Sequence, residues 1–391
     1  MLATQPTLED LTANRLSTAA GIEDIAAAWN ELAGDVPFRR YEWLEAWWRH
    51  YERAGWELFV LAVRDAEGAL VALAPWYRHR TLISGRTIAF LGSGEVCSDY
   101  LTVLAAPELA ELVAVRLADW LTCEGRDEWD TIELDGIERQ DPVVGGLIQA
   151  LEARGCLAHR RQRIGAWRLE LPGDWKSYTS RLSKSRRGGV RTVEKRYFET
   201  GRARVRSAEC AAEVERGLAI LHDLHQRRRK SLGDSGCFAS PRFAGFLAEV
   251  ARRFHALGRL RLQWIELDGR PVAAEFDLSS SAAVYHYQSG IDPDAMPDKP
   301  GWLMQISALK KAIEEGFQAF DFLRGDEPYK SWWRAERRPL FEVRLVAPRV
   351  SARLRHGVWA AGVRGKAWLR GFSEWVKQRR SLRGGDANSN E

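Results

Sequence analysis

Two stretches about 200 residues apart share one pattern and decide the fold. Residues 56–77 read WELFVLAVRDAEGALVALAPWY, and residues 258–278 read GRLRLQWIELDGRPVAAEFDL. In each, an alternating apolar run meets a short turn of acidic residues and glycine, and a second apolar run follows. This pattern is typical of a β-hairpin. The sequence therefore predicts a hairpin in each half of the chain.

The same order of elements surrounds both hairpins. The first is followed by a predicted strand, loop, helix and strand at 87–91, 92–99, 107–123 and 129–135. The second is followed by the same four elements at 283–289, 290–301, 302–316 and 317–323. Two helices precede each hairpin, at 22–32 with 41–54 and at 211–230 with 241–257. We expect two related α/β (α+β) units, each a mixed, mostly antiparallel sheet flanked by helices.

Composition agrees with a globular chain of this organisation. The 391 residues are 45% hydrophobic, and 58 Lys and Arg against 53 Asp and Glu leave a net charge of +5. Anion binding would therefore depend on local clusters of basic residues. Two such clusters are predicted, one between the units and one at the C-terminus, where tryptophans recur in a helical rhythm. The expected divisions are a first unit over 1–165, a basic helical linker over 166–210, a second unit over 211–348 and a basic amphipathic tail over 349–391.

The N-terminus and the cysteines indicate the compartment. No apolar segment reaches the length of a membrane span, and the N-terminus has no apolar core of a signal peptide. The five cysteines are scattered and form no CxxC pair, which argues against a disulfide framework and a structural zinc site. We expect a cytoplasmic protein without a metal, whose tail contacts an anionic membrane peripherally.

One long segment resembles a known family. Residues 285–333, YHYQSGIDPDAMPDKPGWLMQISALKKAIEEGFQAFDFLRGDEPYKSWW, resemble GNAT-superfamily acetyltransferases of the CelD/BcsL type. That family is related to the FemABX aminoacyl transferases, whose chains contain two GNAT-like units. Shorter stretches that match lie at 37–51, 90–103, 182–201 and 238–251.

The resemblance implies both a fold and an activity. The fold is two tandem GNAT-like units, with the acyl donor bound by the second. The activity is that of a GNAT-type N-acetyltransferase, which transfers an acetyl group directly from acetyl-CoA to an amine or hydroxyl acceptor. The acceptor would be a small molecule or a saccharide, and the family is linked with exopolysaccharide or cell-envelope synthesis.

The donor is expected at the loop that opens the helix near residue 301. A helix N-terminus favours a pyrophosphate, because its positive end and free N–H groups attract anions. The chain has neither a GxGxxG nor a GxxxxGK[ST] loop, so an ordinary turn is the alternative. The predicted donor-binding residues are Gln288, Ser289, Gly290, Pro300, Gly301 and Trp302.

Titratable residues on the second unit's strands are candidates for proton transfer. Glu275 and Asp277 share one face of a strand, and Glu275 lies between apolar neighbours, which would raise its pKa as a general base needs. His286 titrates near neutrality. A solvent-facing carboxylate and a packed histidine are the alternatives.

A dense polar stretch follows at a strand end, over residues 321–330. Asp321 or Glu327 would accept a proton, and Tyr329 would protonate the leaving thiolate. Lys330 would hold an oxyanion or a phosphate, as its resemblance to the lysine-bearing region of Fem-type sites implies.

Acceptor recognition is expected in the first unit. Asp99 and Tyr100 follow a glycine loop at the position equivalent to the donor loop, and Trp47 would contribute an aromatic wall for a sugar or an apolar amine. Core packing is the alternative for the aromatic residues. Cys237 has no histidine partner that the sequence identifies.

Two other functions remain open at this stage. A Fem-like aminoacyl transferase would use the basic linker to bind tRNA, and nucleic acid is expected only in that case. A non-catalytic, membrane-peripheral component of polysaccharide synthesis would use the basic tail. The sequence does not identify the acceptor.

Overall fold

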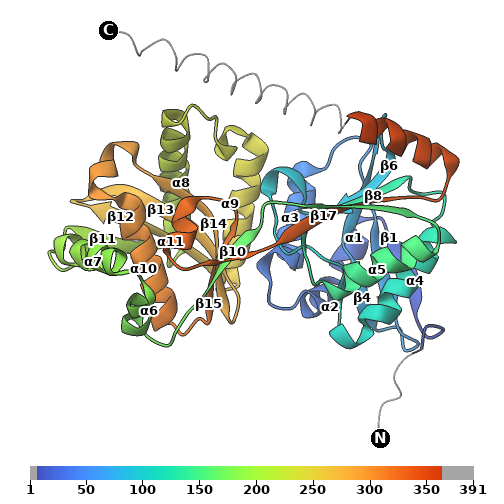
Figure 1. Cartoon of the computed structure of the whole chain (residues 1–391), viewed down its shortest axis with the longest axis horizontal. Helices are drawn as coiled ribbons and strands as arrows, with labels where there is room; N and C mark the ends of the chain where they lie inside the picture. The colour runs from blue at the N-terminus through green and yellow to red at the C-terminus, as the bar shows by residue number, and fades with distance from the viewer. Residues whose placement is uncertain (1–6, 363–391) are drawn as a thin grey trace, which may run out of the picture.

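A computed structural model describes residues 7–362 and contains two α/β units that lie side by side (Figure 1). The first unit has a four-stranded sheet in the order β1(Thr12–Leu16), β3(Val60–Arg64), β4(Leu70–Ala74) and β7(Leu104–Ala105). It also has a six-stranded sheet, β2(Glu57–Leu58), β5(Trp76–Thr81), β6(Gly85–Phe90), β8(Thr131–Glu138), β17(Leu340–Val346) and β9(Leu157–Gln162). The first unit is therefore built around two sheets.

The second unit has a single seven-stranded sheet. Its order is β11(Ala203–Ser207), β12(Leu260–Leu267), β13(Arg270–Ser279), β14(Ala283–Ile291), β15(Ala319–Arg324), β10(Ala166–Glu170) and β16(Glu336–Arg338).

Helices cover the sheets of both units. Those of the first unit are α1(Ala19–Glu23), α2(Ala26–Leu32), α3(Tyr41–Tyr51), α4(Ala110–Thr122) and α5(Pro142–Ala153). Those of the second are α6(Trp175–Arg181), α7(Lys184–Val193), α8(Ala211–Ser231), α9(Pro241–Ala256), α10(Pro300–Glu314) and α11(Pro328–Trp332). Residues 350–362 are helical and lie over the first unit (Figure 1). No helix within residues 7–362 is long and apolar enough to cross a membrane.

The predicted repeat is confirmed at the level of the elements. β12 and β13 form an antiparallel hairpin whose turn residues, Asp268 and Gly269, both have positive φ, as a type I′ turn requires. In each unit a helix then leads to a strand that pairs in parallel with an earlier one, β8 with β6 and β15 with β14. The predicted second run of the first hairpin is divided at Pro75, so β4 and β5 lie in different sheets.

Three strands differ from the expected divisions of the chain. β17 lies within the predicted second unit, but it pairs with β8 and β9 of the first unit's sheet. The predicted helical linker includes two strands, β10 and β11, which both belong to the second sheet. The physical reason is that each strand obtains its backbone hydrogen bonds from a distant segment, which local patterns do not reveal. Most of the predicted tail, residues 363–391, lies outside the described residues.

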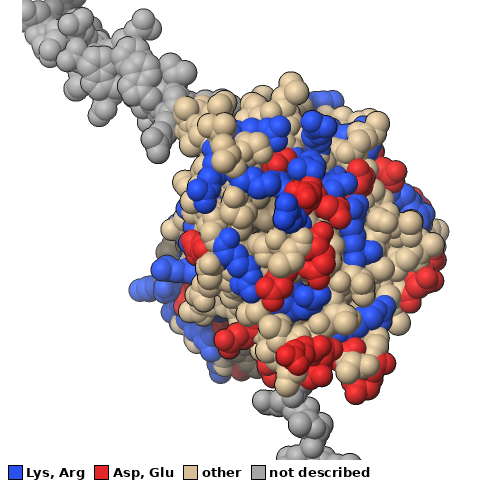
Figure 2. Space-filling model, turned by 90° about the vertical axis from the view of Figure 1, so that its right-hand side faces the viewer, with Lys and Arg blue, Asp and Glu red and all other residues tan. Residues whose placement is uncertain are grey.

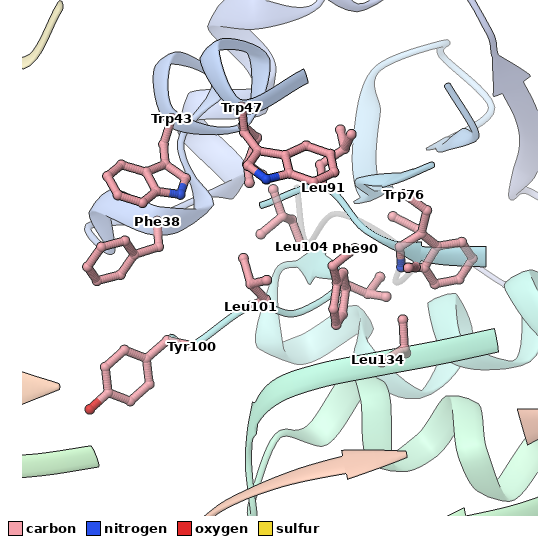
Figure 3. Packing of buried hydrophobic residues seen from close by; sticks show 14 of the residues in the cluster. Phe38, Trp43, Trp47, Trp76, Phe90, Leu91, Tyr100, Leu101, Leu104 and Leu134 are labelled. Atoms are coloured by element: carbon pink, nitrogen blue, oxygen red, sulfur yellow. The ribbon is translucent and has the colours of Figure 1, made fainter. Parts of the chain in front are cut away.

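A continuous aromatic core joins the two units. Trp43 of α3 contacts Tyr287 of β14 and Phe246 of α9 edge to face, at ring-centroid distances of 5.0 and 4.9 Å. Phe38 packs in the same way against Tyr285, at 5.8 Å. Figure 3 shows Phe38 and Trp43 in this cluster of the first unit. Because such contacts bury large apolar surfaces, we expect the two units to act as one body.

Candidate active site

The second sheet opens where β14 and β15 separate. The two strands pair in parallel from Ala283 opposite Ala319 to Tyr285 opposite Asp321, and β14 then continues without this neighbour. A cavity of about 400 Å³ lies there, bounded by β13, β14, α8, α10 and α11. Its lining includes seven of the residues predicted from the sequence: Glu275, His286, Ser289, Gly301, Trp302, Glu327 and Tyr329.

A buried cluster of proton-transfer groups forms one wall. Nδ1 of His286 lies 2.8 Å from a carboxylate oxygen of Asp277, and this contact leaves Nε2 as the ring nitrogen available to the cavity. Glu275 accepts a hydrogen bond of 2.5 Å from the amide of Gln305 on α10. Its other oxygen, Oε2, is buried without a hydrogen-bond partner and lies 3.9 Å from Nδ1 of His286.

The surroundings raise the pKa values of Glu275 and His286. Burial raises the pKa of Glu275 to about 8, although His286 and Gln305 favour the ionised form. Burial by itself would lower the pKa of His286, but the carboxylates of Glu275 and Asp277 outweigh it and raise the pKa. The cluster can therefore exchange protons near physiological pH, as general acid–base catalysis requires.

The same three side chains have the composition of a metal site. One ligand atom each from Glu275, Asp277 and His286 lies within 4.8 Å of the others. A cation bound there would have to replace the Asp277–His286 hydrogen bond. The hydrogen-bonded arrangement suits proton transfer, in which the carboxylate orients the imidazole.

Tyr329 and Glu327 approach the cavity from the start of α11. Burial and the nearby carboxylates of Glu327 and Glu275 raise the pKa of Tyr329, so its hydroxyl stays protonated and can donate a proton. Burial would raise the pKa of Glu327, but the charge and hydrogen bond of Lys330 outweigh it and lower the pKa. Tyr329 is thus a proton donor and Glu327 an anion at neutral pH.

The N-terminus of α10 borders the cavity at Gly301 and Trp302. Pro300 has no N–H, and the N–H groups of Trp302 and Leu303 donate to the carbonyl of Lys299. The expected row of free N–H donors is thus shorter than in a typical anion site. Basic side chains replace part of it, because Arg228 and Arg229 of α8 line the cavity.

An arginine of the linker also reaches this region. The guanidinium of Arg186, on α7, lies over the rings of Trp302 and Trp332, at 5.2 and 4.2 Å from their centroids. Both tryptophans line the cavity. The basic linker therefore lies beside the cavity.

The other predicted donor-binding residues do not line the cavity. Gln288 lies opposite Phe276 in the sheet, and Pro300 is buried at the start of α10. Gly290 packs against α8 so closely that a Cβ would lie 2.5 Å from the backbone nitrogen of His225. Glycine at this position therefore serves helix–sheet packing.

The structure does not bring Lys330 or Asp321 to the cavity. The ammonium of Lys330 is buried and donates to the carbonyls of Leu323, Arg324 and Gly325 at 2.9–3.3 Å. It thereby holds the turn after β15. Asp321 lies on the opposite face of the sheet, where it accepts a 2.6 Å hydrogen bond from Tyr100.

The predicted acceptor residues of the first unit are all buried and contact other protein side chains. Trp47 is 1% exposed and packs against Tyr51, Trp56 and Tyr77 in the core that Figure 3 shows. Asp99 is completely buried and forms an ion pair with Arg324 of the second unit. Tyr100 bonds to Asp321, as described above. Core packing, the alternative considered for Trp47, is the arrangement observed.

Several residues of the site are not among the predicted candidates. Asp277, which contacts His286 behind the cavity wall, is noted only as the neighbour of Glu275, and the i, i+2 spacing is the available signal. Gln305 gave no signal, because an amide on a helix is common. His225 of α8 lines the cavity, and its Nε2 lies 3.3 Å from the sulfur of Cys237, which provides the partner that the sequence did not identify. Burial raises the pKa of this thiol to about 12.

A larger cavity elsewhere in the second unit lacks this chemistry. It measures about 690 Å³ and lies between α10, β11 and the π-helix Glu194–Phe198. Its polar lining consists mainly of half-exposed side chains such as Lys311, which bonds to Ser207. Size alone therefore does not identify the site.

Comparisons with known proteins agree with the fold. Residues 184–331 match the family model described as an acetyltransferase (GNAT) domain. No curated protein matches the chain. The solved structure of FemX is similar, with 12% identity, a TM-score of 0.60 and coverage of 87% of this chain and 99% of that chain.

Two further structures have similar folds. One is a conserved protein of unknown function from Bacteroides thetaiotaomicron, with 12% identity, a TM-score of 0.55 and coverage of 86% and 100%. The other is the C-terminal domain of a putative lysylphosphatidylglycerol synthetase from Agrobacterium fabrum. It has 11% identity and a TM-score of 0.51, and the match covers 88% of this chain and 97% of that chain. At these identities the likeness concerns the fold, and the predicted CelD/BcsL type stays a prediction. Residues 184–331 are thus similar to a GNAT acetyltransferase domain, and the chain as a whole has a fold similar to that of FemX.

Proposed function

We propose that the protein transfers an acyl group, in the first instance acetyl from acetyl-CoA, to an amine or hydroxyl acceptor in the cavity of the second unit. The observation that carries this proposal is that His286, oriented by Asp277 and next to Glu275, lines a cavity where two parallel strands separate. The GNAT family match over the same segment supports an acyl donor there.

The residues fit the donor at two places. The positive end of α10 and the guanidinium groups of Arg228 and Arg229 suit the phosphates of a nucleotide thioester. The aromatic faces of Trp302 and Trp332 suit its apolar parts. Acetyl-CoA when bound supplies the activated thioester.

Proton transfer can be assigned to two side chains. Nε2 of His286 removes the proton of the acceptor amine or hydroxyl as this group attacks the thioester carbonyl, and Asp277 stabilises the imidazolium that forms. The new C–N or C–O bond forms, the C–S bond breaks, and the hydroxyl of Tyr329 gives its proton to the leaving thiolate. The proton that His286 has taken up is then released to solvent and Tyr329 takes up another, which restores both side chains. The products are the acylated acceptor and a free thiol.

Binding and thiol release test this proposal. Acetyl-CoA should raise the melting temperature of the full chain, because a ligand that binds only the native state stabilises it. Free thiol should appear when an amine or hydroxyl acceptor is added. Tyr329→Phe keeps the ring and removes the proton donor, so it should lower kcat and leave the affinity for acetyl-CoA unchanged. The absence of any thermal shift at millimolar acetyl-CoA would contradict the proposal.

The acceptor and cellular setting follow as finer proposals. A saccharide acceptor in polysaccharide or cell-envelope synthesis, a cytoplasmic location and membrane contact through the tail rest on the sequence. Transfer from aminoacyl-tRNA, measured in parallel with acetyl-CoA, distinguishes a Fem-like reaction. If neither donor reacts, the remaining hypothesis is a non-catalytic component.

A further inference from the structure

We infer that the first unit contains a second binding site, for an uncharged carbohydrate, on the face of its six-stranded sheet that bears Tyr77, Glu133 and Arg344. A cavity of about 400 Å³ lies on this face. This volume is within the range of small-molecule sites, about 300–1,000 Å³. The inference does not depend on acyl transfer, because none of the lining residues belongs to the donor cavity.

The position of the cavity repeats that of the donor cavity. In the first unit, β6 and β8 pair in parallel from Thr87 opposite Thr131 to Ala89 opposite Glu133, and β6 ends one residue later, at Phe90. Ala89, Glu133 and the following residues Ser93 and Asp135 line the cavity. Each unit of the repeat therefore has a cavity just beyond the paired part of its parallel strands.

A row of mainly polar side chains crosses the sheet beneath the cavity. The strand register places Tyr77, Ala89, Glu133, Arg344 and His159 next to one another on five successive strands. Arg344 is only 4% exposed, and its guanidinium pairs with Glu133 and donates to Ser84. Burial lowers its pKa to about 10. A sheet face with a purely structural role would be apolar here, so this row needs another explanation.

Three polar atoms of residues that line the cavity make no hydrogen bond. Nε of Arg344 and Nδ1 of His79 are buried without a hydrogen bond in the described part of the chain, and Oδ1 of Asp135 has only a 3.5 Å ion pair with Arg163. The first requires an acceptor and the third a donor, while burial lowers the pKa of His79 and keeps its imidazole neutral. Hydroxyl groups both donate and accept, so a polyol can pair with this mixture.

Aromatic rings lie on two sides of the cavity. Trp359, in the helical segment 350–362, lies over the guanidinium of Arg344 at 4.4 Å. Tyr77 is stacked on Trp56, with ring centroids 4.6 Å apart. Because Tyr77 is also stacked on His79, and Trp359 on His356, the rings offer the cavity mainly their apolar edges, against which the C–H groups of a sugar can pack.

The charge balance argues against an anionic ligand. Three carboxylates, Glu133, Asp135 and Glu342, face two guanidinium groups, Arg161 and Arg344. On the outer surface of this unit, basic and acidic side chains are likewise interspersed (Figure 2). A phosphate would gain little from such a field. The donor cavity differs, since Arg228 and Arg229 line it.

Calorimetric titration of the full chain tests the inference. The probes are neutral hexasaccharides: α-1,4- and β-1,4-linked glucose, and β-1,4-linked N-acetylglucosamine. We expect at least one to bind with a Kd of about 1 mM or tighter. Trp359→Ala should weaken it about tenfold, as the loss of one aromatic contact predicts. The side chain is only partly buried and also contacts Arg344, so the variant should stay folded at the titration temperature, which its melting temperature checks.

The matched control is the aromatic truncation at the donor cavity. Trp332→Ala, at a half-exposed tryptophan, should leave hexasaccharide affinity unchanged, and Trp359→Ala should leave the affinity for CoA unchanged. Absence of binding by all three probes overturns the inference. So does a loss of binding in Trp332→Ala but not in Trp359→Ala, which would locate the saccharide in the second unit. Neither result bears on the thermal shift with acetyl-CoA, so the two proposals fail separately.

Discussion

Replacing Asp99 by alanine tests whether this residue joins the two units or recognises an acceptor. The carboxylate accepts hydrogen bonds from the backbone N–H of Arg324, at 2.7 Å, and from its Nε. It is completely buried, whereas the Arg324 side chain is 23% exposed. Burial raises the pKa of Asp99 even though Arg324 opposes this, so the pair itself adds little net stability.

The loss of one partner is nevertheless costly. Breaking a buried ion pair on one side typically destabilises a protein by about 3–5 kcal/mol, because the remaining charge is left unpaired. Arg324 would retain a 2.9 Å bond to the carbonyl of Ser98 and a longer contact to Asp135, at 3.5 Å. We therefore expect Asp99→Ala to lower the free energy of unfolding by about 3 kcal/mol, the lower end of that range.

Urea unfolding followed by tryptophan fluorescence measures this change. The matched control is Asp135→Asn, at the longer and partly exposed contact of the same arginine, which should cost less than about 1 kcal/mol. The kcat/KM of folded Asp99→Ala should remain close to that of the wild type. A loss below about 1 kcal/mol together with a large fall in kcat/KM would refute the structural role and restore the acceptor role.

Three further predictions concern the catalytic cluster and the contact between the units. His286→Gln should lower kcat by about 10²- to 10⁴-fold, as loss of a general base does. In the wild type the acid limb of the pH profile of kcat/KM should lie above pH 6.5, because Glu275 and Asp277 raise the His286 pKa. Asp277→Asn removes one of these two carboxylates and should move the limb to lower pH. Glu275 has a folded-state pKa of about 8 against an ordinary 4.5, so its contribution to stability is complete below about pH 4.5 and is lost as the pH rises through 8. The melting temperature of Glu275→Gln, relative to that of the wild type, should therefore be higher at pH 9 than at pH 6. An equal difference at both pH values would contradict this assignment. Gly136→Ala should destabilise the protein more than Gly34→Ala in urea unfolding, by about 1 kcal/mol or more. Both positions have positive φ, but a Cβ at position 136 would lie 2.8 Å from the carbonyl oxygen of Ser98, while a Cβ at position 34 would meet nothing within 4 Å. Equal losses would exclude a tight contact at position 136.

The proposed functional site was only partly predictable. Glu275, His286 and Tyr329 could be selected because each is a titratable group on or beside an apolar strand, and the structure brings all three to one cavity. Lys330 has the same kind of sequence signal, but its ammonium turns inward to three carbonyl groups. The direction of a side chain at a strand end depends on the backbone of the following turn, which sequence periodicity does not determine.

Local sequence patterns are enough to predict the repeat, since alternation of apolar residues and turn chemistry are local properties, and the hairpin β12–β13 forms where they predict it. Long-range pairing is visible only in the folded chain: β17 returns to the first sheet, and Asp99 pairs with Arg324 at a separation of 225 residues. The same is true of Arg344, whose neighbours in the row come from four other strands. Pairings of this kind depend on which distant segments can satisfy each other's hydrogen bonds and charges, and no local pattern contains that information.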